Sequence, residues 1–489
     1  MRPASARTEL IPIDIDRSSG VPLFRQVYAQ IRDAVATGKL KPGDKLPSTR
    51  ALSARLKVAR AVVVTAFEQL LAESVIGGRV GAGTFVSEHL PHDLSHRAAE
   101  KSSRPATFQV PAGLRDGFLE HASAQDDRPF ATGRTRFDPR TTTVWRRLST
   151  RAARDIGRSD LGYADPRGSE ALRGVVCRYL QTARGVRAEN DQIVITTGTQ
   201  QAVDLAIRVL LKPGDTAWVE DPGYILTAQA LKAAGIALCP VPVDGDGLHV
   251  GQGLKSAPKA RAAFITPSNQ FPTGAVMSMA RRLELLTWAK ARQSWIIEDD
   301  YASEYRYGGK PLASLQGLDD VGRVIYVGTL NKVLFPGLRM GYLVAPRDLV
   351  AAFVGMRYLM DRQPASLTQA MVTAFMTEGH FAAHLRRMRA AYAEQRDTLT
   401  AELTKHGSDL FDIVAPDQGL HLVAYLKKHR SDLRLESQLR PKGVVVRAMS
   451  RLYLNAKPRQ ALMLGFSGFS PEQIRPAAKE LVLAARATL

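Results

Sequence analysis

Cysteine is nearly absent from this sequence of 489 residues, which contains only Cys177 and Cys239. Two cysteines cannot supply a disulfide framework, so the sequence favours a reducing compartment, the cytoplasm. Long apolar runs are also missing, because none reaches the ~18 residues that a membrane-spanning helix needs. The first 20 residues lack the apolar centre of a signal peptide. We therefore expect a cytoplasmic protein with no membrane span.

Acidic residues are the second shortage, with 47 Asp and Glu against 67 Lys and Arg and a net charge of +20. The excess is concentrated in two blocks. Residues 1–87 hold 13 basic against 7 acidic side chains, and residues 130–187 hold 13 arginines against 5 acids. Such blocks suggest a polyanion, and nucleic acid first, as the partner. The alternative is a solvated basic surface that favours solubility.

The chain is too long for one hydrophobic core, because single cores stop growing near ~250–300 residues. In its first part, apolar residues recur at four-residue spacing and predict an amphipathic helix over about residues 22–37. Ser48 is placed to cap a second helix, and a third is expected from Arg60 to Glu73. Short β segments around Gly81 and Gly83 then predict a hairpin. Three helices followed by a hairpin form the winged helix-turn-helix plan.

This stretch resembles the GntR family of bacterial regulators in "PLFRQVYAQIRDAV", "KLKPGDKLPSTRALSARL" and "RVGAGTFV". The resemblance implies binding to a double-stranded DNA operator. It assigns the DNA-facing and wing positions to Ser48, Arg50, Arg60, Thr65, Arg79 and Gly83. Arginine suits phosphates or guanine edges. Ala61 and Val62 depart from the family, because they offer no side-chain hydrogen bond where polar residues usually stand.

Residues 88–129 are polar, mixed in charge and without periodicity, which indicates a mostly flexible linker. A coil of this length spans on the order of 35 Å. That reach would let one chain's DNA-binding domain sit on the other chain of a dimer.

From residue 130 the chain alternates apolar strands with helical patterns, as in "QIVITTGTQQAVDLAIRVLL", "SWIIEDDYASEY" and "VIYVGTLNK". This alternation predicts an α/β domain with a parallel sheet covered on both faces. Ligands of such sheets bind at the carboxyl ends of the strands. The candidate site residues in these strand segments fall at such an end or just beyond it, which predicts one composite site.

The candidate residues at this edge suit pyridoxal 5′-phosphate (PLP). Lys332 can form a Schiff base once it is partly desolvated. Asp299 can pair with a protonated ring nitrogen and make the ring an electron sink. Tyr301 can donate to the phenolic oxygen, and Tyr224 can stack on the ring. Taken singly, each residue also has a structural interpretation: a turn cap for Asp299, a core position for Tyr224, a solvent-facing amine for Lys332.

A phosphate cup is expected beside the ring. Gly198 begins a helix, and the free backbone N–H groups there, with Thr199 and Gln200, can hold a phosphate. Thr329 and Arg339 can complete the cup with a hydroxyl and a bidentate cation. A Gly-Thr pair before a helix is also a common helix cap. The prediction of a phosphate site therefore depends on the other candidate residues beside it.

These motifs resemble the class I (fold type I) aminotransferases. Together with the GntR-like part, the chain resembles the MocR subgroup over nearly its full length. The resemblance implies PLP held by Lys332, Asp299, Tyr301 and the phosphate cup. It implies a head-to-tail homodimer with exchanged DNA-binding domains, in which Tyr163 of "LGYADPRGSEALR" reaches the phosphate across the interface.

The sequence departs from the family at three positions. Asn331 precedes the lysine where serine is usual, and Asn269 of "TPSNQFPTG" replaces a histidine. Met463 occupies the place of the arginine that grips the substrate carboxylate. Arg447 is the expected substitute for an effector carboxylate, and a surface arginine after a buried strand is an equal alternative.

The sequence thus predicts three parts: a winged helix-turn-helix domain (1–87), a linker (88–129) and a PLP-dependent transferase fold type I domain (130–489). The leading hypothesis is a transcription regulator that senses PLP, an amino acid or another small amine through an aldimine. The second is a working aminotransferase tethered to DNA. The third, a cofactor-free dimerisation scaffold, conflicts with the intact Lys332, Asp299, Tyr301 and Arg339 set. No metal ligands are expected.

Overall fold

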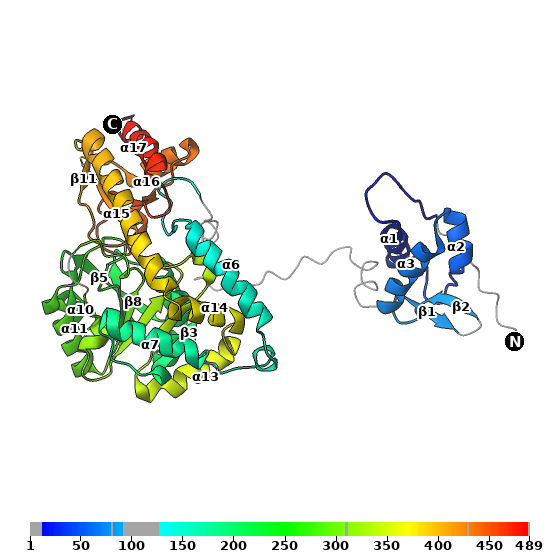
Figure 1. Ribbon diagram of the computed structural model, residues 1–489, viewed down its shortest axis with the longest axis horizontal. Coiled ribbons are helices and arrows are strands. Elements are labelled where there is room, and N and C mark those ends of the chain that lie inside the picture. Colours follow the sequence, from blue (N-terminus) through cyan, green and yellow to red (C-terminus); the bar gives the residue numbers. More distant parts are fainter. Residues whose placement is uncertain (1–11, 80–81, 91–126, 309–311, 428–429, 488–489) are drawn as a thin grey trace. The chain divides into compact units, whose positions relative to one another are not determined.

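The computed structural model describes residues 12–79, 82–90, 127–308, 312–427 and 430–487. The chain divides into two compact units, one within residues 1–109 and the other within residues 110–489 (Figure 1). Most of the linker predicted for residues 88–129 lies outside the described residues. Among the described helices, none is long and apolar enough to cross a membrane.

The N-terminal unit has three helices followed by a hairpin, in the order that the sequence predicts. The helices are α1 (Leu23–Ala36), α2 (Thr49–Leu56) and α3 (Arg60–Ala72), and the antiparallel strands are β1 (Ile76–Arg79) and β2 (Gly83–Val86). The apolar stripe of α1 is buried as expected, because Val27, Ile31 and Val35 are at most 3% exposed. They share one core with Val63 and Phe67 of α3.

A helix cap and a left-handed residue fix the helix-turn-helix. Ser48 Oγ accepts a hydrogen bond from the backbone N–H of Ala51 at 3.2 Å, which is the predicted cap of α2. Lys57 adopts a left-handed conformation (φ 53°) directly after α2 and so ends that helix. The hairpin is joined to the loop before α2 by the hydrogen bond from Leu46 N to Thr84 O, at 2.9 Å. The winged helix-turn-helix prediction is confirmed.

The C-terminal unit is built on an eight-stranded sheet in the order β3-β10-β9-β8-β7-β4-β5-β6. The strands are β3 (Ile193–Thr196), β4 (Thr216–Asp221), β5 (Ala237–Asp244), β6 (Gly247–Leu248), β7 (Ala262–Ile265), β8 (Trp295–Asp300), β9 (Val324–Thr329) and β10 (Gly341–Val344). The pairs β5–β4, β4–β7, β7–β8 and β8–β9 are parallel. The parallel-rich α/β sheet is therefore confirmed.

Strand β10 is the exception within the parallel-rich sheet beside the site, because it is antiparallel to both β3 and β9. Only residues 330–340 separate β9 from β10. A parallel crossover needs a dozen or more residues, so the chain must turn back instead. This turn carries Lys332 and Arg339 and brings both to the edge where the parallel strands end.

Alternate residues of the strands pack into different cores. Val194, Ile325 and Leu343 face the core formed with α8 (Thr199–Leu210), α9 (Ile225–Ala233) and α13 (Val350–Asp361). Ile195, Tyr326 and Tyr342 face the core formed with α7 (Glu170–Arg184) and α14 (Ser366–Thr377). Helices α10 (Val250–Ser256) and α11 (Met279–Arg292) share a further core with Trp218 and Ile296. Helices therefore cover both faces of the sheet, as predicted.

A smaller α+β part follows the long helix α15 (His380–Gly407). Its antiparallel sheet has the order β11-β12-β14-β13. The strands are β11 (Phe411–Ile413), β12 (His421–Leu426), β13 (Arg447–Ala448) and β14 (Ala461–Gly465). The remaining helices of the C-terminal unit are α6 (Pro139–Arg154), α12 (Leu315–Leu318), α16 (Asp432–Leu439) and α17 (Pro471–Ala487). Figure 1 shows α15 and α17 beside each other, in agreement with their many contacts.

Candidate functional site

The candidate residues of the C-terminal unit gather at one edge of the large sheet. Gly198 follows β3 and starts α8, and Tyr224 lies between β4 and α9. Asn269 follows β7, and Asp299 is the last residue but one of β8. Lys332 and Arg339 lie in the turn between β9 and β10. The strand ends therefore bring these residues together at one edge of the sheet.

Lys332 is half-buried, and its pKa is lowered from the usual value by that burial. Asp299 opposes this effect and raises the pKa of Lys332, whereas the guanidinium of Arg339 lowers it further. A lysine must lose its proton before it can attack an aldehyde. The surroundings of Lys332 therefore favour the neutral, nucleophilic amine.

Asp299 is a carboxyl whose pKa is raised, although the nearby Lys332 lowers it in part. Burial raises its pKa to about 7, and the neighbouring carboxyls of Asp300 and Glu220 raise it in the same direction. Its Oδ1 atom is buried and has no hydrogen-bond partner among the described residues. A cationic N–H group placed there would satisfy the oxygen and favour the carboxylate. Asp299 therefore fits the protonated ring nitrogen that the sequence assigned to it.

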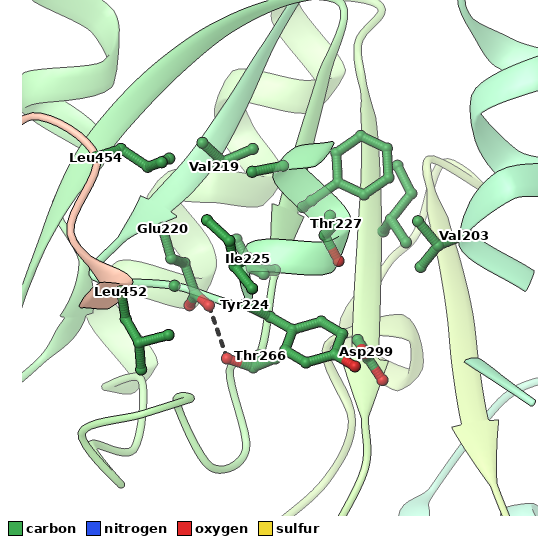
Figure 2. A pocket seen from close by; sticks show the side chains of 15 residues that line it. Val203, Val219, Glu220, Tyr224, Ile225, Thr227, Thr266, Asp299, Leu452 and Leu454 are labelled. Atoms are coloured by element: carbon green, nitrogen blue, oxygen red, sulfur yellow. Dashed lines mark hydrogen bonds between the residues drawn. The ribbon is translucent and has the colours of Figure 1, made fainter. Parts of the chain in front are cut away.

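Glu220, which the sequence analysis missed, is a buried carboxyl close enough to Asp299 to raise its pKa. Its Oε2 accepts a hydrogen bond from Thr266 Oγ1 at 2.7 Å, and burial raises its pKa to about 7. Glu220, Asp299 and Tyr224 line one small cavity (Figure 2). The sequence "WVEDPGY" reads as a strand followed by a turn. Nothing in it indicates that the glutamate lines a cavity together with residues of other strands.

Asn269 positions Tyr301. The amide Nδ2 of Asn269 donates to the Tyr301 hydroxyl at 2.8 Å, and its Oδ1 is buried without a partner among the described residues. Asn269 is 4% exposed, so this geometry is held by packing. The asparagine that stands here in place of the family's histidine therefore orients the tyrosine. Its Oδ1 atom is also available to the site as a hydrogen-bond acceptor.

The turn around Gly198 has the shape of an anion cradle. Gly198 has φ +123°, and a Cβ there would lie 2.8 Å from Asn331 Nδ2 and 3.8 Å from the Arg339 guanidinium nitrogens. Asn331 Oδ1 accepts from Met340 N at 2.7 Å, so the asparagine also braces the β9–β10 turn. Thr329 Oγ1 accepts from Asn331 N at 3.1 Å. The cradle thus combines the first turn of α8 with an arginine and two polar side chains, which suits a phosphate.

Thr199 and Gln200 occupy the first two positions of α8, as the cup requires. Gln200 Oε1 is buried and has no hydrogen-bond partner among the described residues. Their backbone N–H groups belong to the helix end that lacks intrahelical acceptors.

Arg447 stands directly opposite Met463 in the small sheet, because β13 and β14 pair with these two residues in register. Burial lowers the pKa of Arg447, whereas Tyr224 and Glu436 raise it. Tyr224 therefore lies within electrostatic reach, and Arg447 in turn lowers the pKa of His421. Arg447 is thus half-buried beside the site rather than on an open surface.

An aromatic cluster that the sequence analysis did not identify lies between Tyr224 and the small sheet. The Phe271 ring is 5.5 Å from Tyr224, 6.1 Å from Tyr301 and 5.7 Å from His421 between ring centroids. His421 Nε2 donates to Pro272 O at 2.9 Å. Phe271 stands in the motif "TPSNQFPTG" near Asn269, and its aromatic side chain between the two prolines of that motif is the sequence signal for this cluster.

Tyr163 is the one predicted cofactor residue that the structure does not bring into this site. Its side chain is 78% exposed, and the Arg362 guanidinium lies 4.0 Å from its ring centroid. An exposed tyrosine is what a contact to a second chain would require.

The predicted DNA-facing residues lie on α2, α3 and the hairpin. Arg50, Arg60 and Thr65 are exposed, and Arg60 Nε donates to Thr49 Oγ1 at 3.3 Å. Ser48 is exposed while its hydroxyl caps α2. Arg60 and Thr65 therefore stand on α3, the helix that the winged helix plan places in the major groove.

The hairpin residues are constrained by local contacts. Arg79 pairs with Glu88 at 2.6 Å, and its guanidinium lies 5.0 Å from the Phe85 ring centroid. Gly83 has φ +107°, a conformation that favours glycine. Among the described residues, no group of three or more His, Cys, Asp or Glu side chains is placed to hold a metal ion.

A winged helix-turn-helix unit joined to an α/β unit with this strand-edge site defines a class of proteins, the DNA-binding regulators with an aminotransferase-like domain. Residues 23–86 match the family "Bacterial regulatory proteins, gntR family", and residues 129–481 match "Aminotransferase class I and II". The chain therefore belongs to the MocR-type regulators of the GntR family, and it is a DNA-binding transcription regulator.

The chain is similar to several named proteins over most of its length. It is 36% identical to the "Probable rhizopine catabolism regulatory protein MocR" of Rhizobium meliloti, over 96% of this chain and 94% of that protein. It is 28% identical to the "HTH-type pyridoxine biosynthesis transcriptional regulator PdxR" of Corynebacterium glutamicum, over 95% and 96%. The α-aminoadipate aminotransferase LysN of Thermus thermophilus, solved with N-(5′-phosphopyridoxyl)-L-leucine, matches 78% of this chain and 97% of its own. For that pair the TM-score is 0.70 and the identity 25%.

Proposed function

We propose that the C-terminal unit holds PLP through Lys332 and that an amino compound competing for the cofactor changes how the regulator binds its operator. The observation that carries this proposal is the buried, unpartnered Asp299 Oδ1 beside a half-buried lysine of lowered pKa. A cofactor that offers a cationic N–H to the acid and an aldehyde to the amine satisfies both groups at once. The name of PdxR and the ligand of LysN agree with this chemistry.

Each residue then has a physical role. Lys332 supplies the amine and Asp299 the counter-charge, while Tyr301, oriented by Asn269, supplies a hydroxyl. The α8 N-terminus and Arg339 hold the phosphate, joined by Tyr163 from a second chain. Arg447 holds the carboxylate of an amino acid effector. When bound, PLP supplies an electron sink for whatever amine is attached to it.

We propose further that the protein acts as a head-to-tail homodimer with exchanged DNA-binding domains, in the bacterial cytoplasm and on chromosomal DNA. Exposed apolar side chains near Tyr163 support a dimer, because large apolar residues are costly to leave in water. Leu161 is 75% exposed and Leu359 79% exposed. Light scattering of the purified protein tests the dimer, and a monomeric mass at micromolar concentration contradicts it.

The test of the cofactor and the sensor is one titration on the full-length protein. PLP is added while visible absorbance and affinity for a DNA fragment selected from a random pool are recorded together. Visible absorbance that borohydride reduction fixes to Lys332 supports the proposal. PLP that binds no protein lysine, or leaves DNA affinity unchanged in the presence and absence of competing amines, contradicts it.

The working aminotransferase remains the alternative, and turnover separates the two. A sensor needs only reversible capture of an amine, whereas an enzyme must transfer the amino group repeatedly to a keto acid. The experiment is a multiple-turnover assay with several amino acids and 2-oxoglutarate or pyruvate. Less than one turnover per protein subunit supports the sensor, and sustained turnover supports the enzyme.

A further inference from the structure

Residues 128–136 lie just before α6, on the part of the chain that comes from the N-terminal unit. We name them the wall segment. Within this segment Gly133 has φ +83°, and a Cβ there would lie 2.9 Å from Lys332 Nζ. The backbone of the wall segment therefore lies against the reactive amine itself. Only a glycine tolerates both the left-handed backbone and the close approach.

The same segment is hydrogen-bonded to the small sheet on its other side. Gly465 N at the end of β14 donates to Phe130 O at 2.9 Å, and Val445 N donates to Pro129 O at 3.0 Å. Val445 stands two residues before Arg447. Further along, Ser467 Oγ donates to Arg134 O at 2.5 Å. The wall segment is thus hydrogen-bonded to the end of β14, two residues after Met463, and to the loop residue two positions before Arg447.

Close packing and strain make this arrangement sensitive to displacement. Phe130 is fully buried although its φ of 72° is left-handed, a conformation that bulky residues rarely adopt. A Cβ at Gly465 would lie 2.5 Å from Ala131 O, so the two backbones are in direct contact. Strained backbone persists only where its surroundings impose it. A displacement of the small sheet, or of Lys332 toward Gly133, therefore acts on the wall segment.

We propose that the wall segment senses whether Lys332 is bound to the cofactor and passes this state along the chain toward the DNA-binding unit. This inference rests on the proposed function, because it requires a lysine that is alternately bound and free. A freed amine carries hydrogen-bond donors that need acceptors, and it lies against the Gly133 backbone. A lysine bound through a C=N bond would keep at most one N–H donor, because its other hydrogens leave when the bond forms. The two states therefore make different demands on the wall segment.

The first test is hydrogen exchange of the full-length protein followed by mass spectrometry. Three states are compared: without PLP, with PLP, and with PLP plus aminooxyacetate, which takes the aldehyde from the lysine. Peptides covering residues 127–136 and the amides of Gly465 and Val445 should exchange several-fold differently when Lys332 is bound and when it is freed. A peptide from α11 serves as the unaffected reference.

Unchanged exchange in these peptides, while the absorbance reports binding and release of the lysine, would overturn the inference and leave the cofactor site standing. A protein that shows no PLP absorbance at all would overturn the proposed function and this inference with it. The two failures are therefore distinguishable.

The second test uses a matched pair of glycine variants. Gly133→Ala adds a Cβ at the lysine, whereas Gly214→Ala adds one at a similar φ of +91° with no atom within 4 Å. The measured quantity is the ratio of DNA affinities with PLP alone and with PLP plus aminooxyacetate. We expect a ratio of at least about fivefold for the wild-type protein and for G214A. We expect G133A to bring it close to one. A wild-type ratio in G133A, or a ratio of one in the wild-type protein, refutes the relay.

Discussion

Arg447 and Met463 are direct partners across the antiparallel strands β13 and β14. Residues paired in this way present their side chains on the same face of the sheet, with Cβ atoms about 5 Å apart. By family resemblance, aminotransferases carry the carboxylate-binding arginine at the position of Met463. Arg447 therefore carries a guanidinium one strand away from that position and on the same face of the sheet, and we propose that it binds the effector carboxylate there.

The first prediction concerns this displaced arginine. Arg447→Met should remove the preference for aminooxyacetate over methoxyamine, two probes with the same reactive nitrogen that differ by a carboxylate. A hydrogen bond to a charged group contributes about 1.5–3 kcal/mol, so the affinity for aminooxyacetate should fall roughly tenfold to a hundredfold. The affinity for methoxyamine should stay the same. Both are measured from the absorbance of the cofactor.

The swapped variant Arg447→Met with Met463→Arg should recover part of the preference, because the guanidinium returns to the same face one strand away. Arg451→Ala is the control, since Arg451 is exposed and pairs with Glu436 at 2.7 Å. If R451A lost the preference and R447M kept it, the carboxylate would be bound by Arg451, and its assignment to Arg447 would be wrong.

The second prediction concerns the lysine. Lys332→Ala should abolish the visible absorbance of the lysine-linked cofactor, because no other described lysine lies in the site. The far-ultraviolet circular dichroism should remain that of the wild-type protein. Lys255→Ala, at an exposed position of α10, is the matched control and should keep the absorbance. Borohydride-stable labelling of K332A at another lysine is the outcome that contradicts the assignment.

The third prediction concerns α3. Arg60→Ala should weaken operator binding by about 1–3 kcal/mol if the arginine reads a base edge. If it contacts only phosphate, all sequences should weaken alike and the salt slope should fall by about one unit. Fluorescence anisotropy at several salt concentrations measures both quantities. Arg25→Ala, an exposed arginine on α1, should change neither. An effect of R25A equal to that of R60A would show that only overall charge matters.

The strand-edge part of the site was predictable because its residues follow strands with clear patterns. Lys332, Asp299 and Tyr301 each stand at the end of an apolar run, and parallel strands bring such ends together. The direction of β10 was also encoded, since the turn before it is too short for a crossover. A count of the residues between the two strands would have predicted it.

Glu220 and Gly133 were not predictable from local pattern, for a physical reason. Glu220 matters because of Thr266, which directly follows the neighbouring strand β7, and because of Asp299 on β8, the next strand of the sheet. Gly133 matters because it meets Lys332, 199 residues further along the chain. No periodicity or turn chemistry within a single segment reports such contacts. They arise only from tertiary packing.

The final prediction concerns the dependence of stability on pH, and it follows from Glu220. Burial raises the pKa of this carboxyl from 4.5 to about 7 in the folded protein. Between these two values the folded chain keeps a proton that the unfolded chain has released. The free energy of unfolding must therefore fall as pH rises from about 4.5 to about 7 and then level off. Asp299, whose pKa is also raised to about 7, adds a decline in the same direction.

Glu220→Gln should remove its share of the decline, because glutamine cannot ionise and can still accept the Thr266 hydrogen bond. The raised pKa of Glu220 corresponds to a change of roughly 3 kcal/mol in the free energy of unfolding between the two pH values. The measurement is urea unfolding of the PLP-free protein at pH 5 and pH 7.5, for the wild-type protein, Glu220→Gln and the surface control Glu68→Gln. We expect the difference between the two pH values to shrink in E220Q and to remain unchanged in E68Q. An identical difference in all three proteins would show that Glu220 is already ionised at pH 5. A positive charge near Glu220 would then stabilise its ionised form, because the Thr266 hydroxyl alone supplies no charge.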